Sequence, residues 1–137
     1  MRRLLLLLAP LATAAEPPAA LWREVSPPDA PAVRTVLFEP CRATLDRGAI
    51  EIVRRNGLYL RDHPGLGVGI LSLSDSRASR SYNLALAFQR AKAVADLLQL
   101  YDIPPERIVL LPYGEEGGRE GRSLGRRVRL IYLERRE

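Results

Sequence analysis

The side chains best placed to do chemistry in this sequence lie in residues 74–94, SDSRASRSYNLALAFQRAKAV. Asp75 stands in a short polar turn, Tyr82 and Asn83 follow it, and Arg90 comes seven residues after Asn83 on a predicted helix. A carboxylate that a loop presents just ahead of a helix can hold a cationic group. Together with an arginine pair near the C-terminus, the pattern predicts a site that holds a small zwitterion between a carboxylate and a guanidinium.

The arginine pair is Arg126 and Arg127, in the segment GRRV at 125–128. A planar guanidinium makes bidentate hydrogen bonds to a carboxylate, and charge-assisted bonds are roughly twice as strong as neutral ones. Neighbouring residues on a strand point to opposite faces, so only one arginine of the pair can enter a site while the other points away. We favour Arg126 as the arginine that binds the ligand.

Each of these residues also has a structural interpretation. Asp75 could close an Asx-turn before the helix, which is a common use of aspartate in loops. We expect Tyr82 and Asn83 to dock and cap the helix rather than to touch a ligand. For Arg90 we expect a surface or loop-bracing ion pair.

The first 15 residues have the pattern of a secretory signal peptide. Arg2 and Arg3 precede an apolar run, and small residues follow it at 12–15. The run is shorter than the roughly 20 residues that a spanning helix needs, so we expect an exported mature chain without a membrane span. That chain has 19 basic and 16 acidic residues, a net charge of +3. This excess is too small to argue for nucleic acid and fits anionic envelope polymers or lipid head groups better.

Residues 16–33 contain five prolines and are predicted to form a semi-rigid linker, because proline disfavours both helix and central strand. Trp22, within this segment, is expected to pack back on the domain. The remaining residues, 34–137, amount to roughly 100 and make one domain of ordinary size.

Hydrophobic patterns and turn residues predict six elements in this domain. They are a strand over 34–40, a helix over 44–63, a strand over 65–74, a helix over 82–101, and strands over 107–113 and 126–133. The order β-α-β-α-β-β predicts an α+β sandwich with both helices packed on one face of a mixed four-stranded sheet.

Two apolar stripes support the helices, and Thr44 is the expected N-cap of the first. The stripes consist of Ile50, Val53, Gly57 and Leu60 in the first helix and of Ala87, Ala91, Val94, Leu98 and Tyr101 in the second. Arg90 and Lys92 are expected to lie outside the second stripe.

An enzymatic role has little support in the sequence. His63 is the only histidine, so there is no histidine cluster for a metal. Cys41 is the only cysteine and is expected to be a small buried hydrophobe. Glu115 and Glu116 are adjacent in the glycine-rich segment 114–125, which is a poor way to fix two carboxylates for acid and base roles. We expect no catalysis, no metal and no cofactor.

Six segments resemble, in order and spacing, the OmpA-like C-terminal domain family, which includes the peptidoglycan-associated lipoprotein and the periplasmic part of flagellar stator proteins. They are VLFEPCRATL at 36–45, SDSRASRSYN at 74–83, LALAFQRAKAVADLL at 84–98, IPPERI at 103–108, YGEE at 113–116 and GRRV at 125–128. The resemblance covers about residues 34–133.

This resemblance implies noncovalent binding of peptidoglycan through the diaminopimelate of the stem peptide. The residue that matches Asp75 engages the free ammonium of diaminopimelate, and an arginine that matches Arg126-Arg127 engages its carboxylate. The implied location is the periplasm, in association with the outer membrane or the cell wall.

The sequence departs from the family at several positions. Ser72-Leu73-Ser74 stands where Gly-His-Thr or Gly-His-Ala is usual, Ala78 replaces a turn glycine, and Gly125 replaces an asparagine. An alternative function is therefore a degenerate domain that keeps the fold without binding peptidoglycan. Such a domain would act as an adaptor that docks envelope or outer-membrane proteins through the proline-rich segment, Trp22 and the glycine-rich loop.

Overall fold

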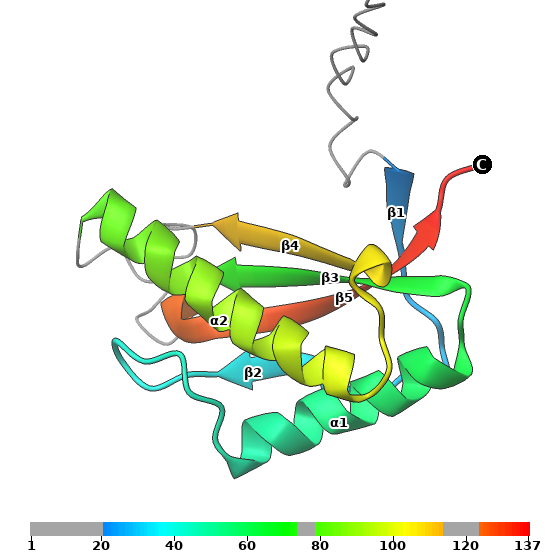
Figure 1. Cartoon of the computed structure of the whole chain (residues 1–137), viewed down its shortest axis with the longest axis horizontal. Coiled ribbons are helices and arrows are strands. Elements are labelled where there is room, and N and C mark those ends of the chain that lie inside the picture. Colours follow the sequence, from blue (N-terminus) through cyan, green and yellow to red (C-terminus); the bar gives the residue numbers. More distant parts are fainter. Residues whose placement is uncertain (1–20, 74–78, 114–123) are drawn as a thin grey trace, which may run out of the picture.

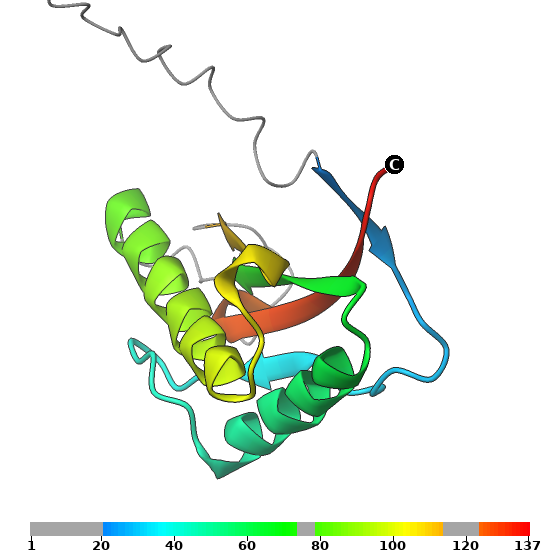
Figure 2. The same ribbon diagram turned by 45° about the vertical axis from the view of Figure 1, so that its right-hand side comes forward.

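The computed structural model describes residues 21–73, 79–113 and 124–137, so the predicted signal peptide lies outside the described residues. The described residues form an α+β fold in which both helices lie on one face of a five-stranded mixed sheet (Figure 1 and Figure 2). The strands are β1 (Trp22–Val25), β2 (Thr35–Leu37), β3 (Leu66–Leu73), β4 (Ile108–Tyr113) and β5 (Arg127–Arg135), and the helices are α1 (Arg47–Asp62) and α2 (Arg80–Leu100). Short 3-10 turns, η2 (Pro105–Arg107) and η3 (Leu124–Arg126), precede β4 and β5.

Strand β5 organises the sheet. One of its edges pairs antiparallel with β2 near the start of β5 and with β1 near its end, while β3 pairs antiparallel with the other edge. Strand β4 lies parallel to β3 on the far side, which makes the sheet mixed, as the sequence predicts. In the registers, Leu37 lies opposite Arg127 and Trp22 lies opposite Arg135, so the two short strands mark the two ends of β5.

The sheet has one strand more than the sequence predicts. Strand β1 lies inside the proline-rich segment, where we expected a linker, but the four residues Trp22–Val25 contain no proline and can pair with β5. Trp22 packs against the domain, as expected, and is only 7% exposed. The prolines that follow, from Pro27 to Pro31, connect β1 to β2.

The caps of both helices differ from the predicted ones. Asp46 rather than Thr44 caps α1, and its Oδ1 accepts a hydrogen bond from the backbone N–H of Ala49 at 2.8 Å. Ser79 caps α2 by accepting from the N–H of Tyr82 at 3.2 Å. The prediction that Tyr82 and Asn83 cap this helix was therefore wrong, because α2 begins earlier and both residues lie in its first turn.

The main core lies between the sheet and the two helices. Alternation along β5 turns Val128, Leu130 and Tyr132 toward the helices and leaves Ile131 and Leu133 on the opposite face, where they pack near Trp22. The predicted helical stripes are mostly buried, with the exceptions of Ile50, which is exposed, and Tyr101, which is half-buried just beyond the end of α2. The helices of the described residues include none long and apolar enough to span a bilayer.

Candidate functional site

Three segments that are far apart in the sequence meet at one end of the sheet. They are residues 38–42 after β2, the first turns of α2, and the turn η3 that leads into β5. We call this region the site end. Here the backbone N–H of Phe38 donates to the carbonyl of Arg126 at 2.9 Å, which joins the first segment to the third.

Arg90 lies at the centre of the site end and joins all three segments. Its Nε donates to the carbonyl of Arg42 at 2.9 Å, Nη2 to the carbonyl of Glu39 at 3.2 Å, and Nη1 to the carbonyl of Gly125 at 3.4 Å. The guanidinium also lies over the ring of Phe38, with its Cζ 5.3 Å from the ring centroid.

The burial of Arg90 corrects the sequence prediction. We expected this side chain outside the apolar stripe of the helix, but it is only 1% exposed. A fixed fork of five donors can be buried when carbonyl oxygens surround it, and here they come from two distant loops. The sequence signal for burial was its spacing, four residues after the buried Leu86 and four before the buried Val94.

The two arginines of the predicted pair lie in different structural elements. Arg127 is the first residue of β5, and because Val128 faces the helices, alternation directs Arg127 to the opposite face of the sheet. Its Nε is buried without a hydrogen-bond partner. Arg126 belongs to η3 and directly follows Gly125, whose carbonyl Arg90 holds. Both side chains are half-buried.

Asp75, the predicted carboxylate of the site, lies outside the described residues. The described residues that flank it, however, both reach the site end. Ser72 pairs with Val128, two positions after Arg126, and Ser79 caps α2. The chain therefore enters and leaves the segment that carries Asp75 at the same end of the sheet as Arg90 and Arg126.

Tyr82 ties the first turn of α2 to the loop after β2. The interaction of its phenol with the neighbouring Cys41 is the main cause that raises the pKa of Tyr82 above its ordinary value. Cys41 itself has a left-handed backbone conformation, with φ of 58°, and is exposed, so our expectation that it is buried was wrong. Asn83 is 1% exposed beneath the same turn, and its N–H donates to the carbonyl of Ser79 at 3.0 Å.

Ser72 carries a polar group into the core at this end. The residue is fully buried on β3, and its Oγ has no hydrogen-bond partner. Among the described residues, the only other buried side-chain polar atom without a partner is Nε of Arg127. Both atoms lie at the site end, where Ser72 is also one of the departures from the family pattern.

The described side chains of the site end suit binding better than bond cleavage. Arg126 is half-buried beside Gly125, and a guanidinium is a donor that holds anionic groups without taking part in proton transfer. In the parts of the chain that the structure describes, no three His, Cys, Asp or Glu side chains come together as a metal site would require.

Comparisons with known proteins give the family and the fold to which the chain is similar. A family model described as "OmpA family" matches residues 37–128. A peptidoglycan-associated lipoprotein of Legionella pneumophila is 35% identical over 109 residues, which are 75% of this chain and 62% of the relative. The chain thus spans less than two thirds of the length of this relative.

Two solved structures have the same fold. The crystal structure of the peptidoglycan-associated lipoprotein from Burkholderia pseudomallei is 26% identical with a TM-score of 0.68, over 74% of this chain and 91% of that one. The periplasmic domain of Helicobacter pylori MotB is 19% identical with a TM-score of 0.59, over 74% of this chain and 70% of that one, and shows the fold alone. The relatives are named for association with peptidoglycan, which is a binding role and agrees with the expectation that the chain is not an enzyme.

Proposed function

Because the chain belongs to the OmpA family, we propose that it is an exported protein of the cell envelope that binds peptidoglycan noncovalently. The names of its relatives support this function, since they associate with peptidoglycan. The predicted signal peptide and the relatives named for association with peptidoglycan support a location in the periplasm, at the cell wall or the outer membrane.

The ligand that we propose is the diaminopimelate of the stem peptide. Its free end carries an ammonium and a carboxylate on one carbon, so a site that holds it needs an anionic group and a cationic group close together. We assign Asp75 to the ammonium and Arg126 to the carboxylate. Arg127 is the weaker candidate because it starts β5 on the face away from the helices.

The observation that carries this proposal is the convergence at the site end. The residues on both sides of the Asp75 segment and the turn that holds Arg126 lie at one end of the sheet, and the buried guanidinium of Arg90 holds the carbonyl of Gly125 next to Arg126. Segments from three parts of the chain are thus held together where a charged ligand would need them. The same arrangement supports a rigid site, because the backbone around Arg126 is fixed by hydrogen bonds from Phe38 and Arg90.

The test is cosedimentation of the purified chain with peptidoglycan that contains diaminopimelate. We expect wild type to sediment and Asp75→Ala and Arg126→Ala to stay in solution. Arg129→Ala is the matched control, since Arg129 lies two residues into β5, is exposed, and pairs with Glu24 at 3.7 Å. Equal binding of all four proteins, or of none, would overturn the proposal. A folded wild type that fails to bind would instead favour the adaptor function.

A second arm of this test addresses the ligand itself. Peptidoglycan with lysine in place of diaminopimelate keeps the ammonium and lacks the neighbouring carboxylate. We expect it to lose the contribution of Arg126, so that wild type and Arg126→Ala bind it equally weakly. Full binding of the lysine form by wild type would exclude diaminopimelate as the recognised group while leaving peptidoglycan binding in place.

A further inference from the structure

We propose that β1 is a mechanical strap that strongly resists a pull on the chain from its N-terminal side when the site end is held. A lower force separates β1 from β5 when the chain is pulled between residue 21 and the C-terminus, because both points lie at the same end of β5. This inference concerns the mechanical resistance of the domain itself and does not rest on the proposed function.

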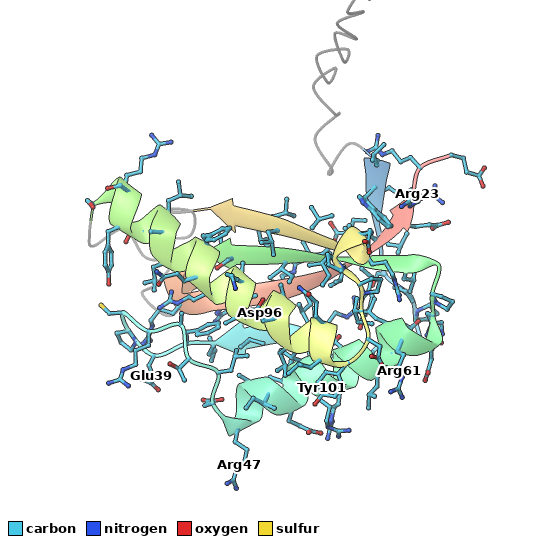
Figure 3. The ribbon with its side chains drawn as sticks, in the orientation of Figure 1. Arg23, Glu39, Arg47, Arg61, Asp96 and Tyr101 are labelled. Carbon is cyan, nitrogen blue, oxygen red and sulfur yellow. The ribbon has the colours of Figure 1, made fainter. Side chains whose placement is uncertain are left out.

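The first observation is where the chain enters the sheet. Trp22 lies opposite Arg135, the last residue of β5, whereas β5 begins at the site end with Arg127. Figure 1 shows β1 beside the C-terminus, and Figure 3 places Arg23 and Glu39 at opposite ends of the molecule. A pull that arrives through residue 21 therefore enters at the end of β5 that is farthest from the site.

The second observation is that the ring of Trp22 fits a notch in β3, the strand on the other side of β5 from β1. A Cβ on Gly67 would lie 2.8 Å from two atoms of the indole ring, so this position accommodates the ring only because it is glycine. The Cζ of Arg135 lies 5.3 Å from the centre of the ring, and Leu133 and Val109 belong to the same apolar cluster. Sliding β1 along β5 would drive the ring out of this notch.

The third observation is a set of polar contacts that hold the start of β1. The backbone N–H of Arg136 donates to the carbonyl of Leu21 at 2.9 Å, and its Nε donates to the carbonyl of Trp22 at 3.2 Å. Arg23 forms an ion pair with Glu134 at 3.2 Å. The last residues of the chain thus hold the first residues that the structure describes.

The direction of the pulling force determines whether the residue pairs between β1 and β5 break together or one after another. When residue 21 and Arg126 are pulled apart, the antiparallel strands β1 and β5 are drawn in opposite directions along their length. This is shear, and the four residue pairs of the ladder resist together. When residue 21 and the C-terminus are pulled apart, the pairs open one at a time from Trp22 and Arg135, because both pulling points lie at the same end.

The segment that follows β1 provides a second point of resistance. The Nδ2 of Asn56 donates to the carbonyl of Val33 at 3.0 Å, and the hydroxyl of Tyr59 donates to Asp29 at 2.8 Å, so α1 holds residues 29–33 independently of β1. If the strap yields, these contacts carry the load before it reaches β2. The core around α1 and α2 remains intact during this first step.

Single-molecule pulling on the purified chain tests the strap. In a Cys41→Ser background, one handle is attached at Ala20→Cys and the other at either Arg126→Cys or Glu137→Cys. We expect the first rupture to need a higher force in the Arg126 geometry, with a ratio up to about four if all four pairs share the load equally. Equal forces in the two geometries, or a higher force in the Glu137 geometry, would overturn the proposal.

A pair of variants identifies the part played by the notch. Trp22→Ala should lower the rupture force in the Arg126 geometry toward the value of the Glu137 geometry, while Leu21→Ala, at an exposed neighbour, should leave both forces unchanged. An unchanged shear force in Trp22→Ala would overturn the role of the notch. No peptidoglycan is present in these measurements, so their outcome is independent of the cosedimentation result.

Discussion

The two ends of the sheet are built in different ways. At the end that holds β1, Trp22 is packed among apolar side chains. The side chains of Arg136 and Arg107 donate hydrogen bonds to backbone carbonyls there. Arg107, for example, donates to the carbonyls of Leu66, Leu60 and His63, and thereby closes the end of α1. At the site end, a fully buried arginine joins three segments, and two buried polar atoms have no partner.

This difference indicates that the ends serve different purposes. Unpaired buried polar atoms and a left-handed non-glycine residue each reduce stability, and such features are retained where function requires them. The two unpaired buried atoms, on Ser72 and Arg127, both lie at the site end, whereas left-handed non-glycine residues occur there at Cys41 and also at Asp102 after α2. We infer that packing at the β1 end raises the free energy of unfolding, and that the unpaired polar atoms at the site end lower it. Four predictions test or refine this comparison.

The largest effect is expected from Trp22→Ala at the β1 end. Removing a buried tryptophan typically costs about 3–5 kcal/mol in the free energy of unfolding, because a large apolar surface and its packing are lost. Urea unfolding measures the loss. Cosedimentation of the folded variant with peptidoglycan should match wild type, and a loss of binding by the folded variant would contradict the separation of the two ends.

Arg90→Met is expected to affect both stability and binding. Its guanidinium holds three carbonyls, and hydrogen bonds that involve a charged group are worth roughly 1.5–3 kcal/mol each at most, so we expect destabilisation by about 2–4 kcal/mol. Peptidoglycan binding should fall even at temperatures where the variant is folded, because the Gly125 carbonyl next to Arg126 is released. Arg90→Lys keeps the charge without the planar fork and should recover only part of both losses. Wild-type stability and binding in Arg90→Met would contradict this role.

A smaller effect of opposite sign is expected from Ser72→Ala. This change removes a buried hydroxyl that has no partner, so unfolding measurements should show stabilisation by about 1 kcal/mol. Ser79→Ala, seven residues away, is the matched control and should destabilise by about 1 kcal/mol because it removes the cap of α2. If both serine variants lost stability, the hydroxyl of Ser72 would have a partner at the site end.

The smallest effect is expected from Glu51, which lies on the surface of α1. Hydrogen bonds from Arg54 and Arg55 lower the pKa of Glu51 from 4.5 to about 2. A lowered pKa in the folded state means that the contribution to stability is present above pH 4.5 and is lost as the pH falls toward 2. The melting temperature of Glu51→Gln should therefore lie slightly below that of wild type at pH 6 and converge with it near pH 2. A difference that grows as the pH falls would contradict this sign.

Sequence patterns predict most of the secondary structure because the signals are local. The stripe through Ala87, Ala91, Val94 and Leu98 identifies α2, and alternation identifies β5, since both periods follow from the geometry of the backbone itself. Strand β1 escaped prediction because its four residues carry too little periodicity, and the surrounding prolines indicate a linker. Its pairing depends on β5, more than a hundred residues away.

The candidate site was predicted less completely than the fold. The types of side chain and the resemblance to a family pointed to Asp75 and the arginine pair, and both remain predictions to be tested by binding. The central position of Arg90 did not follow from the sequence, because its acceptors are backbone carbonyls, which every residue has. No residue type marks the carbonyls of Glu39, Arg42 and Gly125 as a binding pocket for a guanidinium.

The residue pattern alone gives the order of the helices and most of the strands, the two-layer arrangement and the membership in the OmpA family. The packing of distant segments decided which carbonyls surround Arg90, that Cys41 is exposed, and that Trp22 fits the notch at Gly67. The physical reason is that hydrophobic periodicity depends on residues close together in the sequence. The surroundings of a buried charge or aromatic ring depend instead on segments that are distant in the sequence and come together only in the fold.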